Sequence, residues 1–217
     1  MPTQPEIRSF EWLSSVLDRL SRRHATLLIG IDGPGGSGKS SFAHALARRR
    51  NDVTIVEMDD FFLPSSARVP GDPRAKPIGA DFDWQRLRDQ VLLPLGEDHP
   101  GWYQRYDWEQ DHLAEWHTIP VGGVVVVEGV YSTRDEYYPA HYDFTIWLEC
   151  APQIRLARGL ARNGESIREI WEQDWMVAED LYIASQHPNL RADLIVDSSG
   201  QVQHDHSAEF ICLGPAT

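Results

Sequence analysis

Residues 33–40 read Gly-Pro-Gly-Gly-Ser-Gly-Lys-Ser and match the pattern G-x-x-x-x-G-K-[ST] of a phosphate-binding P-loop. The apolar run at 26–31 before this loop suits a buried parallel strand, and residues 40–50 after it are patterned as a helix. A strand, a glycine-rich turn and a helix in this order are what the motif requires. The stretch therefore predicts an α/β fold that binds a nucleoside triphosphate.

Each part of the loop has a physical task. Glycines let backbone N–H groups approach phosphate oxygens closely, and the helix that follows offers free N–H groups and a partial positive charge. We expect Lys39 to reach the β and γ phosphates and Ser40 to place its hydroxyl on Mg²⁺. The residues expected to hold the nucleotide are Gly33, Gly35, Gly36, Ser37, Gly38, Lys39, Ser40 and Ser41.

The signatures of several other nucleotide-dependent classes are missing from the sequence. There is no N-K-x-D motif of a GTPase, no L-S-G-G-Q-like motif of a transporter ATPase, and no H-R-D or D-F-G of a protein kinase. With a length of 217 residues, these absences indicate a small-molecule kinase. A regulator that binds a nucleotide without transferring phosphate is the alternative from a different class.

Two further predicted strands end in acidic residues. Residues 53–58 run into Asp59 and Asp60, and residues 124–127 run into Glu128. Ligands of an open α/β sheet sit beyond the carboxyl ends of its strands, so Asp59 and Glu128 should face the triphosphate. One carboxylate can orient Mg²⁺ and the other can accept a proton from the attacking hydroxyl. Asp60 could take the place of Asp59, because neighbouring side chains on an extended segment point to opposite faces.

Three arginines, Arg155, Arg158 and Arg162, have the spacing of one helix face. In a chain with a net charge of -13, this concentration favours a lid that closes on the transferring phosphoryl group over a solvated face with scattered ion pairs. The Asn163-Gly164 step could serve as a hinge. We therefore place a lid at roughly residues 155–170 and assign Arg158 and Arg162 to catalysis.

The composition narrows the class of protein. Hydrophobic residues make up 41% and charged residues 24%, which fits one globular domain over residues 1–217. An acidic surface repels nucleic-acid phosphates. No apolar run approaches the roughly 18–20 residues of a membrane span, and the N-terminus has no secretory pattern. We expect a cytoplasmic protein without nucleic-acid or membrane partners, and leave a homo-oligomer open.

The order of the predicted elements indicates a mostly parallel sheet flanked by helices. Residues 60–82 are rich in Pro, Gly and Ser, and such a long connection is usually functional or mobile, so we place an acceptor-side insertion there. The tail beyond Gly200 is weakly patterned. Strands are predicted at 26–31, 53–56, 124–127, 144–148 and 194–196, alternating with helices at 6–22, 40–50, 83–93, 152–162 and 165–185.

The P-loop and five further segments occur in the order seen in the uridine kinase family, within the wider uridine kinase and phosphoribulokinase group. The chain resembles a short bacterial member over roughly residues 26–197. The resemblance implies a P-loop kinase fold, a five-stranded parallel sheet with a helical lid. It also implies that ATP or GTP, with Mg²⁺, donates a phosphate to the 5′-hydroxyl of uridine or cytidine. The segments are Met-Asp-Asp-Phe-Phe at 58–62, Phe-Asp at 82–83, Arg-Tyr-Asp-Trp at 105–108, Val-Glu-Gly-Val at 127–130 and Arg-Leu-Ala-Arg at 155–158.

The resemblance also implies roles for residues near the transferred phosphate. Asp59 matches the family's base at the end of the second strand, and Arg158 and Arg162 match its lid arginines. With Asp59 as the base, we assign Glu128 together with Ser40 to the metal.

On the acceptor side, Asp83 falls in the family's nucleoside-contacting segment, with Asp81 as the alternative. Tyr106 matches the aromatic residue that contacts the nucleobase, and we place Arg105 beside it among the substrate-binding residues.

The departures from the family's pattern fall on the acceptor side. Residues 76–81 replace the family's Asn-Phe-Asp-His-Pro, and the lid's Arg-Asp is Arg162-Asn163 here. His112 stands one residue late for the histidine that follows the Tyr-Asp-Phe segment. The sequence therefore still predicts phosphoryl transfer. The acceptor could be a nucleoside or a different compound, namely another sugar, a vitamin precursor or a nucleotide.

Overall fold

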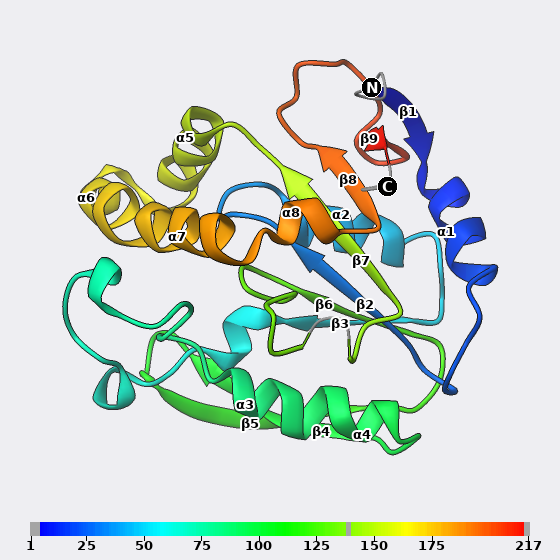
Figure 1. The fold of residues 1–217 in the computed structure, drawn as a ribbon, viewed down its shortest axis with the longest axis horizontal. Helices are drawn as coiled ribbons and strands as arrows, with labels where there is room; N and C mark the ends of the chain where they lie inside the picture. The colour runs from blue at the N-terminus through cyan, green and yellow to red at the C-terminus, as the bar shows by residue number, and fades with distance from the viewer. Residues whose placement is uncertain (1–4, 138–139, 215–217) are drawn as a thin grey trace.

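A seven-stranded sheet forms the centre of the computed structural model, which describes residues 5–137 and 140–214 (Figure 1). Residues 1–4, which carry part of the expectation about targeting, lie outside the described residues. The strand order is β1-β9-β8-β7-β2-β6-β3, and β4 pairs with β5 in a separate hairpin. The strands are β1 (Glu6–Ser9), β2 (Leu27–Asp32), β3 (Val53–Glu57), β4 (Gly101–Asp107), β5 (His112–Ile119), β6 (Val124–Glu128), β7 (Phe144–Glu149), β8 (Leu194–Asp197) and β9 (Glu209–Gly214).

Five of these strands, β8, β7, β2, β6 and β3, run parallel, as the sequence predicts. Every residue of β2 and β6 is buried, which suits strands covered on both faces. The sheet is wider than the predicted five strands, because β9 pairs antiparallel with β8 and β1 pairs antiparallel with β9. Residues 6–9 were expected to be helical, and the tail beyond Gly200 showed only a weak pattern. The pairing of β1 with β9 joins residues about 200 positions apart in the chain, which local periodicity does not reveal.

The helices follow the predicted order with two irregular segments. Residues 84–96 form one continuous helical rod, in which Arg88–Leu92 is a π-helical segment. Pro94 explains this segment, because it has no N–H to donate and its ring crowds the carbonyl one turn earlier. A second π-helical segment, Trp171–Trp175, joins α6 to α7. The helices are α1 (Phe10–Asp18), α2 (Lys39–Ala47), α3 (Trp84–Leu87), α4 (Leu93–Gly96), α5 (Pro152–Asn163), α6 (Arg168–Ile170), α7 (Met176–Gln186) and α8 (Pro188–Arg191).

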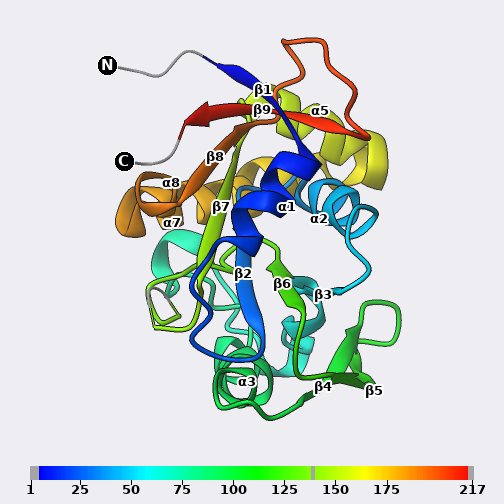
Figure 2. The same cartoon turned by 90° about the vertical axis from the view of Figure 1, so that its right-hand side faces the viewer.

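Alternate residues of the strands build two hydrophobic layers. Leu27, Ile29 and Ile31 of β2 pack with α1 and α2 on one face, where Figure 2 shows these two helices side by side. Leu28, between them, packs on the other face with the 84–96 rod and the hairpin. In Figure 1, α5–α7 lie at the upper left of the view, and α3, α4 and the hairpin lie at the bottom.

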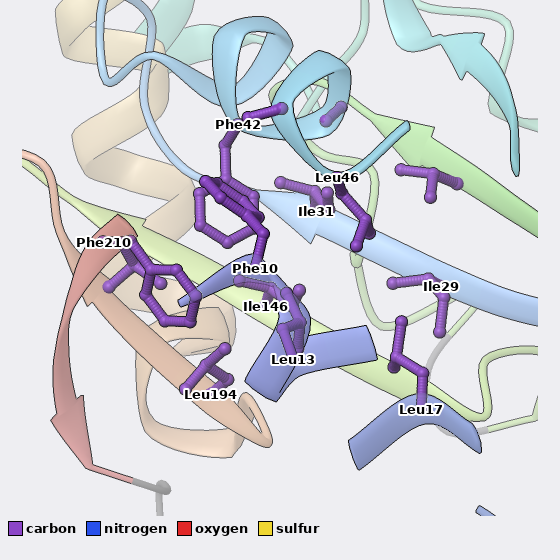
Figure 3. Packing of buried hydrophobic residues seen from close by; sticks show 14 of the residues in the cluster. Phe10, Leu13, Leu17, Ile29, Ile31, Phe42, Leu46, Ile146, Leu194 and Phe210 are labelled. Atoms are coloured by element: carbon purple, nitrogen blue, oxygen red, sulfur yellow. The ribbon is translucent and has the colours of Figure 1, made fainter. Parts of the chain in front are cut away.

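Three phenylalanines join the ends of the chain to the P-loop helix (Figure 3). The ring of Phe10, at the start of α1, lies 4.9 Å from Phe42 of α2 and 5.3 Å from Phe210 of β9, measured between centroids. Ser9 caps α1 by accepting the N–H of Trp12 at 3.1 Å. The terminal strands are therefore part of the core that supports α2.

We expect Phe10→Ala to lower the free energy of unfolding by about 3–5 kcal/mol, because the substitution leaves a cavity in this core. Urea unfolding followed by fluorescence measures the change. Leu190→Ala is the control, since Leu190 is 68% exposed and its truncation should stay within about 0.5 kcal/mol. Equal effects of the two substitutions would contradict the role of Phe10 in the core.

Candidate active site

The P-loop connects the carboxyl end of β2 to the first turn of α2. Gly38 is the N-cap of α2 in a left-handed conformation (φ 87°), and no side chain of a described residue caps this helix start. The first N–H groups of α2 are thus free to meet an anion, with the helix dipole behind them. The hydroxyl of Ser37 is buried and has no hydrogen-bond partner among the described residues. These unpaired donors fit the phosphates of a nucleotide.

The loop lysine and the loop serine lie beside the acid that ends β6. Lys39 is 7% exposed, and its Nζ donates to the carbonyl of Pro34 at 3.1 Å. Glu128 is also buried, and β6, which it ends, pairs directly with β2. Burial raises the pKa of Glu128 to about 7, while the charge of Lys39 and a hydrogen bond with Ser40 act in the opposite direction. The structure therefore brings Lys39, Ser40 and Glu128 together, as predicted from the strand order.

The donor set at this point suits Mg²⁺. Ser40 and Glu128 offer oxygen atoms, which are the ligands that this hard cation prefers. Within residues 5–137 and 140–214, no three His, Cys, Asp or Glu side chains are grouped to hold a metal by themselves. A Mg²⁺ ion at Ser40 and Glu128 would thus take its remaining ligands from phosphate and water, as this ion usually does.

The neighbouring acids Asp59 and Asp60 face different surroundings. They lie in the 3-10 turn Met58–Phe61 that follows β3, and not on an extended segment as expected. Although Asp59 keeps solvent access, the protein around its carboxylate raises its pKa, and the positive charges of Lys39 and Arg162 oppose this shift. The carboxylate of Asp60 instead accepts the hydroxyl of Tyr103 at 2.8 Å. Asp59 is therefore the member of the pair that lies within the field of Lys39.

The three arginines of α5 do not share one solvated face. Arg155 is 2% exposed and donates to Glu179 of α7 at 2.8 Å. Arg158 donates to the carbonyl of Gly36 at 3.4 Å and to that of Ser198 at 2.8 Å. Arg158 therefore links the P-loop to the residue that follows β8.

Arg162 is exposed, and its Nε donates to its neighbour Asn163 at 3.1 Å. It is the arginine of α5 whose charge acts on Asp59. Gly164, the expected hinge, ends α5 with a φ of 91°.

On the acceptor side, Asp83 caps the helix that follows the insertion. Its carboxylate accepts the N–H of Arg86 at 3.0 Å, which is the common role of Asp at a helix start. Asp81, the alternative, lies 3.5 Å from the Nζ of Lys76. Contact of either acid with an acceptor stays a prediction.

The hairpin residues are engaged within the hairpin and with the insertion. Tyr106 is 2% exposed, and its hydroxyl donates to Asp111 at 2.6 Å. Its ring lies 5.6 Å from Phe62, the start of the insertion. Arg105 donates to Glu115 at 2.7 Å and to Asp107 at 3.0 Å. Tyr106 therefore joins the hairpin to the insertion, whereas the charge of Arg105 is neutralised inside the hairpin.

Ser41, expected to bind the nucleotide, and His112, which stands one residue late for the family's histidine, have other surroundings. Ser41 is exposed on α2 and lines an open hollow with His44 and Arg48. His112 is exposed at the start of β5, where its ring contacts Gln110. Among the described residues, no hydrogen bond or ion pair joins Ser41 or His112 to Glu128 or Asp59.

Sequence reasoning missed Asp32, a buried carboxylate directly before the P-loop. One oxygen accepts the N–H of Gly33 at 2.7 Å. The other accepts the N–H and hydroxyl of Thr133 at 2.9 and 2.8 Å and the hydroxyl of Tyr182 at 2.6 Å. Asp32 thus ties the loop to the segment after β6 and to α7. An acid closing an otherwise apolar strand was the signal that could have revealed it.

The sheet order, the P-loop after β2 and the acids after β3 and β6 define a P-loop kinase fold. The fold is similar to a structure described as a possible uridine kinase from Bacillus stearothermophilus (TM-score 0.69, 23% identity, 86% of this chain and 96% of that one). It is also similar to D-glycerate 3-kinase from Cryptococcus neoformans (TM-score 0.60, 15% identity, 87% and 94%).

Relatives by sequence include the uridine kinases of Lactobacillus helveticus (29% identical, 81% of this chain and 88% of that protein) and Geobacillus kaustophilus (26%, 81% and 87%). The pattern of the Phosphoribulokinase / Uridine kinase family matches residues 72–204, and the chain belongs to this family. It is therefore a small-molecule kinase of the uridine kinase-like class. In the described parts of the chain, no helix is both long enough and apolar enough to cross a membrane.

We expect Glu128→Gln to stabilise the metal-free protein at about pH 8 and to have little effect near pH 4.5. The pKa of Glu128 rises on folding from 4.5 to about 7, so between these values the folded state binds more protons than the unfolded state. The parent's stability therefore falls as the pH rises through this window, and a neutral glutamine removes that loss, about 1–3 kcal/mol. Urea unfolding with a chelator at the two pH values measures the difference. A difference that does not depend on pH would contradict the burial of an ionising Glu128.

Proposed function

We propose that this protein is an ATP-dependent phosphotransferase that moves the γ-phosphate to a hydroxyl of a small molecule, with a nucleoside such as uridine or cytidine as its acceptor. The observation that carries the proposal is the grouping of Lys39, Ser40, Glu128 and Asp59 at one edge of the sheet. The uridine kinase names of the sequence relatives support the nucleoside. GTP is the alternative donor.

In this proposal the donor nucleotide, bound with Mg²⁺, supplies the phosphoryl group. The N–H groups at the start of α2 bind its phosphates, and Lys39 neutralises negative charge there. Ser40 and Glu128 hold or orient the metal. For Lys39 this means leaving the carbonyl of Pro34, which it contacts in the described structure, for a phosphate oxygen.

Asp59 is proposed to orient the acceptor hydroxyl and to take its proton. Although Asp59 keeps solvent access, the nearby protein raises the pKa of its carboxylate, and a higher pKa makes a better proton acceptor. The charges of Lys39 and Arg162 oppose the shift and favour the ionised form that a base requires. Arg162, on the same side, is suited to stabilise the charge that spreads over the phosphoryl oxygens in the transition state.

The acceptor is proposed to lie between Asp59, Asp83 and Tyr106. The ring of Tyr106 packs with Phe62, and Trp108 stacks on Phe62 at 4.4 Å, so aromatic surface borders this side. Since Arg105 already has two carboxylate partners, we assign it to the shape of the hairpin. Arg158, which braces the P-loop, is proposed to support catalysis through Gly36.

A different acceptor is the second candidate. The family's acceptor segment is replaced at residues 76–81, where Lys76 pairs with Asp81. A segment with other charges alters which hydroxyl compounds can bind, while the phosphate side is unchanged. A nucleotide-binding regulator would show no acceptor-dependent turnover at all.

We expect ADP release to depend on an added acceptor, in a screen of nucleosides, sugars, vitamin precursors and nucleotides read by product mass. Lys39→Ala should lower the turnover at least 100-fold, about 2.7 kcal/mol, because it removes the charge at the β and γ phosphates. Arg49→Ala, which removes a positive charge just beyond the same helix, is the control and should retain turnover. ADP release that no acceptor stimulates would favour the regulator.

We expect Asp59→Asn to bind ATP normally and to lose acceptor phosphorylation, because the amide keeps the shape of the side chain without its basicity. Asp60→Asn should keep most of its turnover, since that carboxylate is engaged by Tyr103. Calorimetry of ATP binding beside product formation with the best acceptor checks both variants. The reverse outcome would make Asp60 the base.

A further inference from the structure

Glu179 of α7 is a buried acid that contacts the P-loop directly. Its side chain is 6% exposed, and its Oε1 accepts the N–H of Gly35 at 2.9 Å. A side chain at position 35 would meet this carboxylate, since a Cβ there would lie 2.7 Å from Oε1. The absence of a side chain at Gly35 is thus what lets Glu179 reach the loop backbone.

The second oxygen of Glu179 is held by α5, the helix in which the predicted lid begins. Oε2 accepts from Arg155 of α5 at 2.8 Å, and Arg155 is as deeply buried as Glu179. The backbone of Arg155 also lies against the loop, because a Cβ on Gly36 (φ 76°) would come within 2.5 Å of its carbonyl oxygen. α5, α7 and residues 35–36 therefore meet at one carboxylate.

Stability alone does not account for this pair. Removing two charges from water costs several kcal/mol, and replacing a buried ion pair by apolar residues is often neutral or stabilising. An unpaired carboxylate here would also repel phosphates bound by the loop. Arg155 cancels that charge, so that Glu179 can serve as a hydrogen-bond acceptor beside an anion site.

The contact decides where one loop N–H points. The N–H of Gly35 donates to Glu179 and is therefore not free to bind a phosphate. The N–H groups at the start of α2 are free to bind one. Lys39 lies close enough for its charge to act on Glu179. The orientation of the loop and the position of its lysine are thus both linked to this carboxylate.

We propose that Glu179 is a positioning residue for phosphate binding: with Arg155 it anchors the N–H of Gly35 and thereby holds the P-loop in its binding shape. The same contact ties the loop to α5, the helix that carries Arg162. The inference rests on the proposed binding of a nucleotide by this loop, but not on the identity of the acceptor.

Two neutral double variants isolate the anchor. R155M/E179Q keeps a carbonyl oxygen for the N–H of Gly35, and R155M/E179L removes it, while both lack the ion pair. We expect the glutamine variant to bind ADP with Mg²⁺ within about threefold of the parent, and the leucine variant at least tenfold more weakly, at similar melting temperatures. Calorimetry with ADP and Mg²⁺ measures the affinities and needs no acceptor.

Equal affinities of the two variants, or a loss that follows the melting temperature, would overturn the proposal. Failure of the kinase proposal looks different: no acceptor would stimulate ADP release from the parent, while the affinity difference would persist.

Amide hydrogen exchange of the parent protein provides a second test that needs no variant to fold. The N–H of Gly35 should be protected before ADP and Mg²⁺ are added and should gain little on binding, whereas those of Lys39 and Ser40 should gain protection. Protection of Gly35 that arises only with ADP would overturn the proposal.

Discussion

Parallel pairing of β2 with β6, and of β6 with β3, is the constraint on which the candidate site depends. Parallel strands end at the same edge, so residues almost 100 positions apart in the chain arrive together. The register pairs Ile31 with Glu128 and Glu57 with Glu128, which sets the acid of β6 beside the P-loop. Apolar layers cover both faces of β2 and β6, so that every residue of these two strands is buried.

Burying charged side chains is the main energetic cost of this arrangement. Each buried acid is stabilised by a different set of partners. Asp32 is satisfied by four hydrogen-bond donors and Glu179 by one arginine and one backbone N–H. Burial raises the pKa of both Glu128 and Glu179, and Glu128 has a single hydrogen-bond partner among the described residues, Ser40. A carboxylate with few partners is suited to bind a cation, whereas the well-satisfied acids hold the loop in place.

The proposed acceptor side is built from elements outside the main sheet. The hairpin, the insertion and the 84–96 rod meet through Tyr106, Phe62 and Asp83. Most polar groups there are already paired with one another. This layer is joined to the turn that carries Asp59, because Arg86 donates to the carbonyl of Asp60 at 2.9 Å and the N–H of Asp83 donates to the carbonyl of Phe61 at 2.7 Å.

Local pattern by itself determined the P-loop, the five parallel strands, the acids after β3 and β6, and the family. Each of these is encoded in a short stretch, either as a motif or as an apolar run. Only the tertiary structure decided which of Asp59 and Asp60 lies near Lys39, because a 3-10 turn replaced the expected strand end. It also buried Arg155 of α5 while leaving Arg158 and Arg162 exposed, added β1 and β9 to the sheet, and brought Asp32 and Glu179 to the loop. These features depend on contacts between residues far apart in the chain, and periodicity within a window carries no information about such contacts.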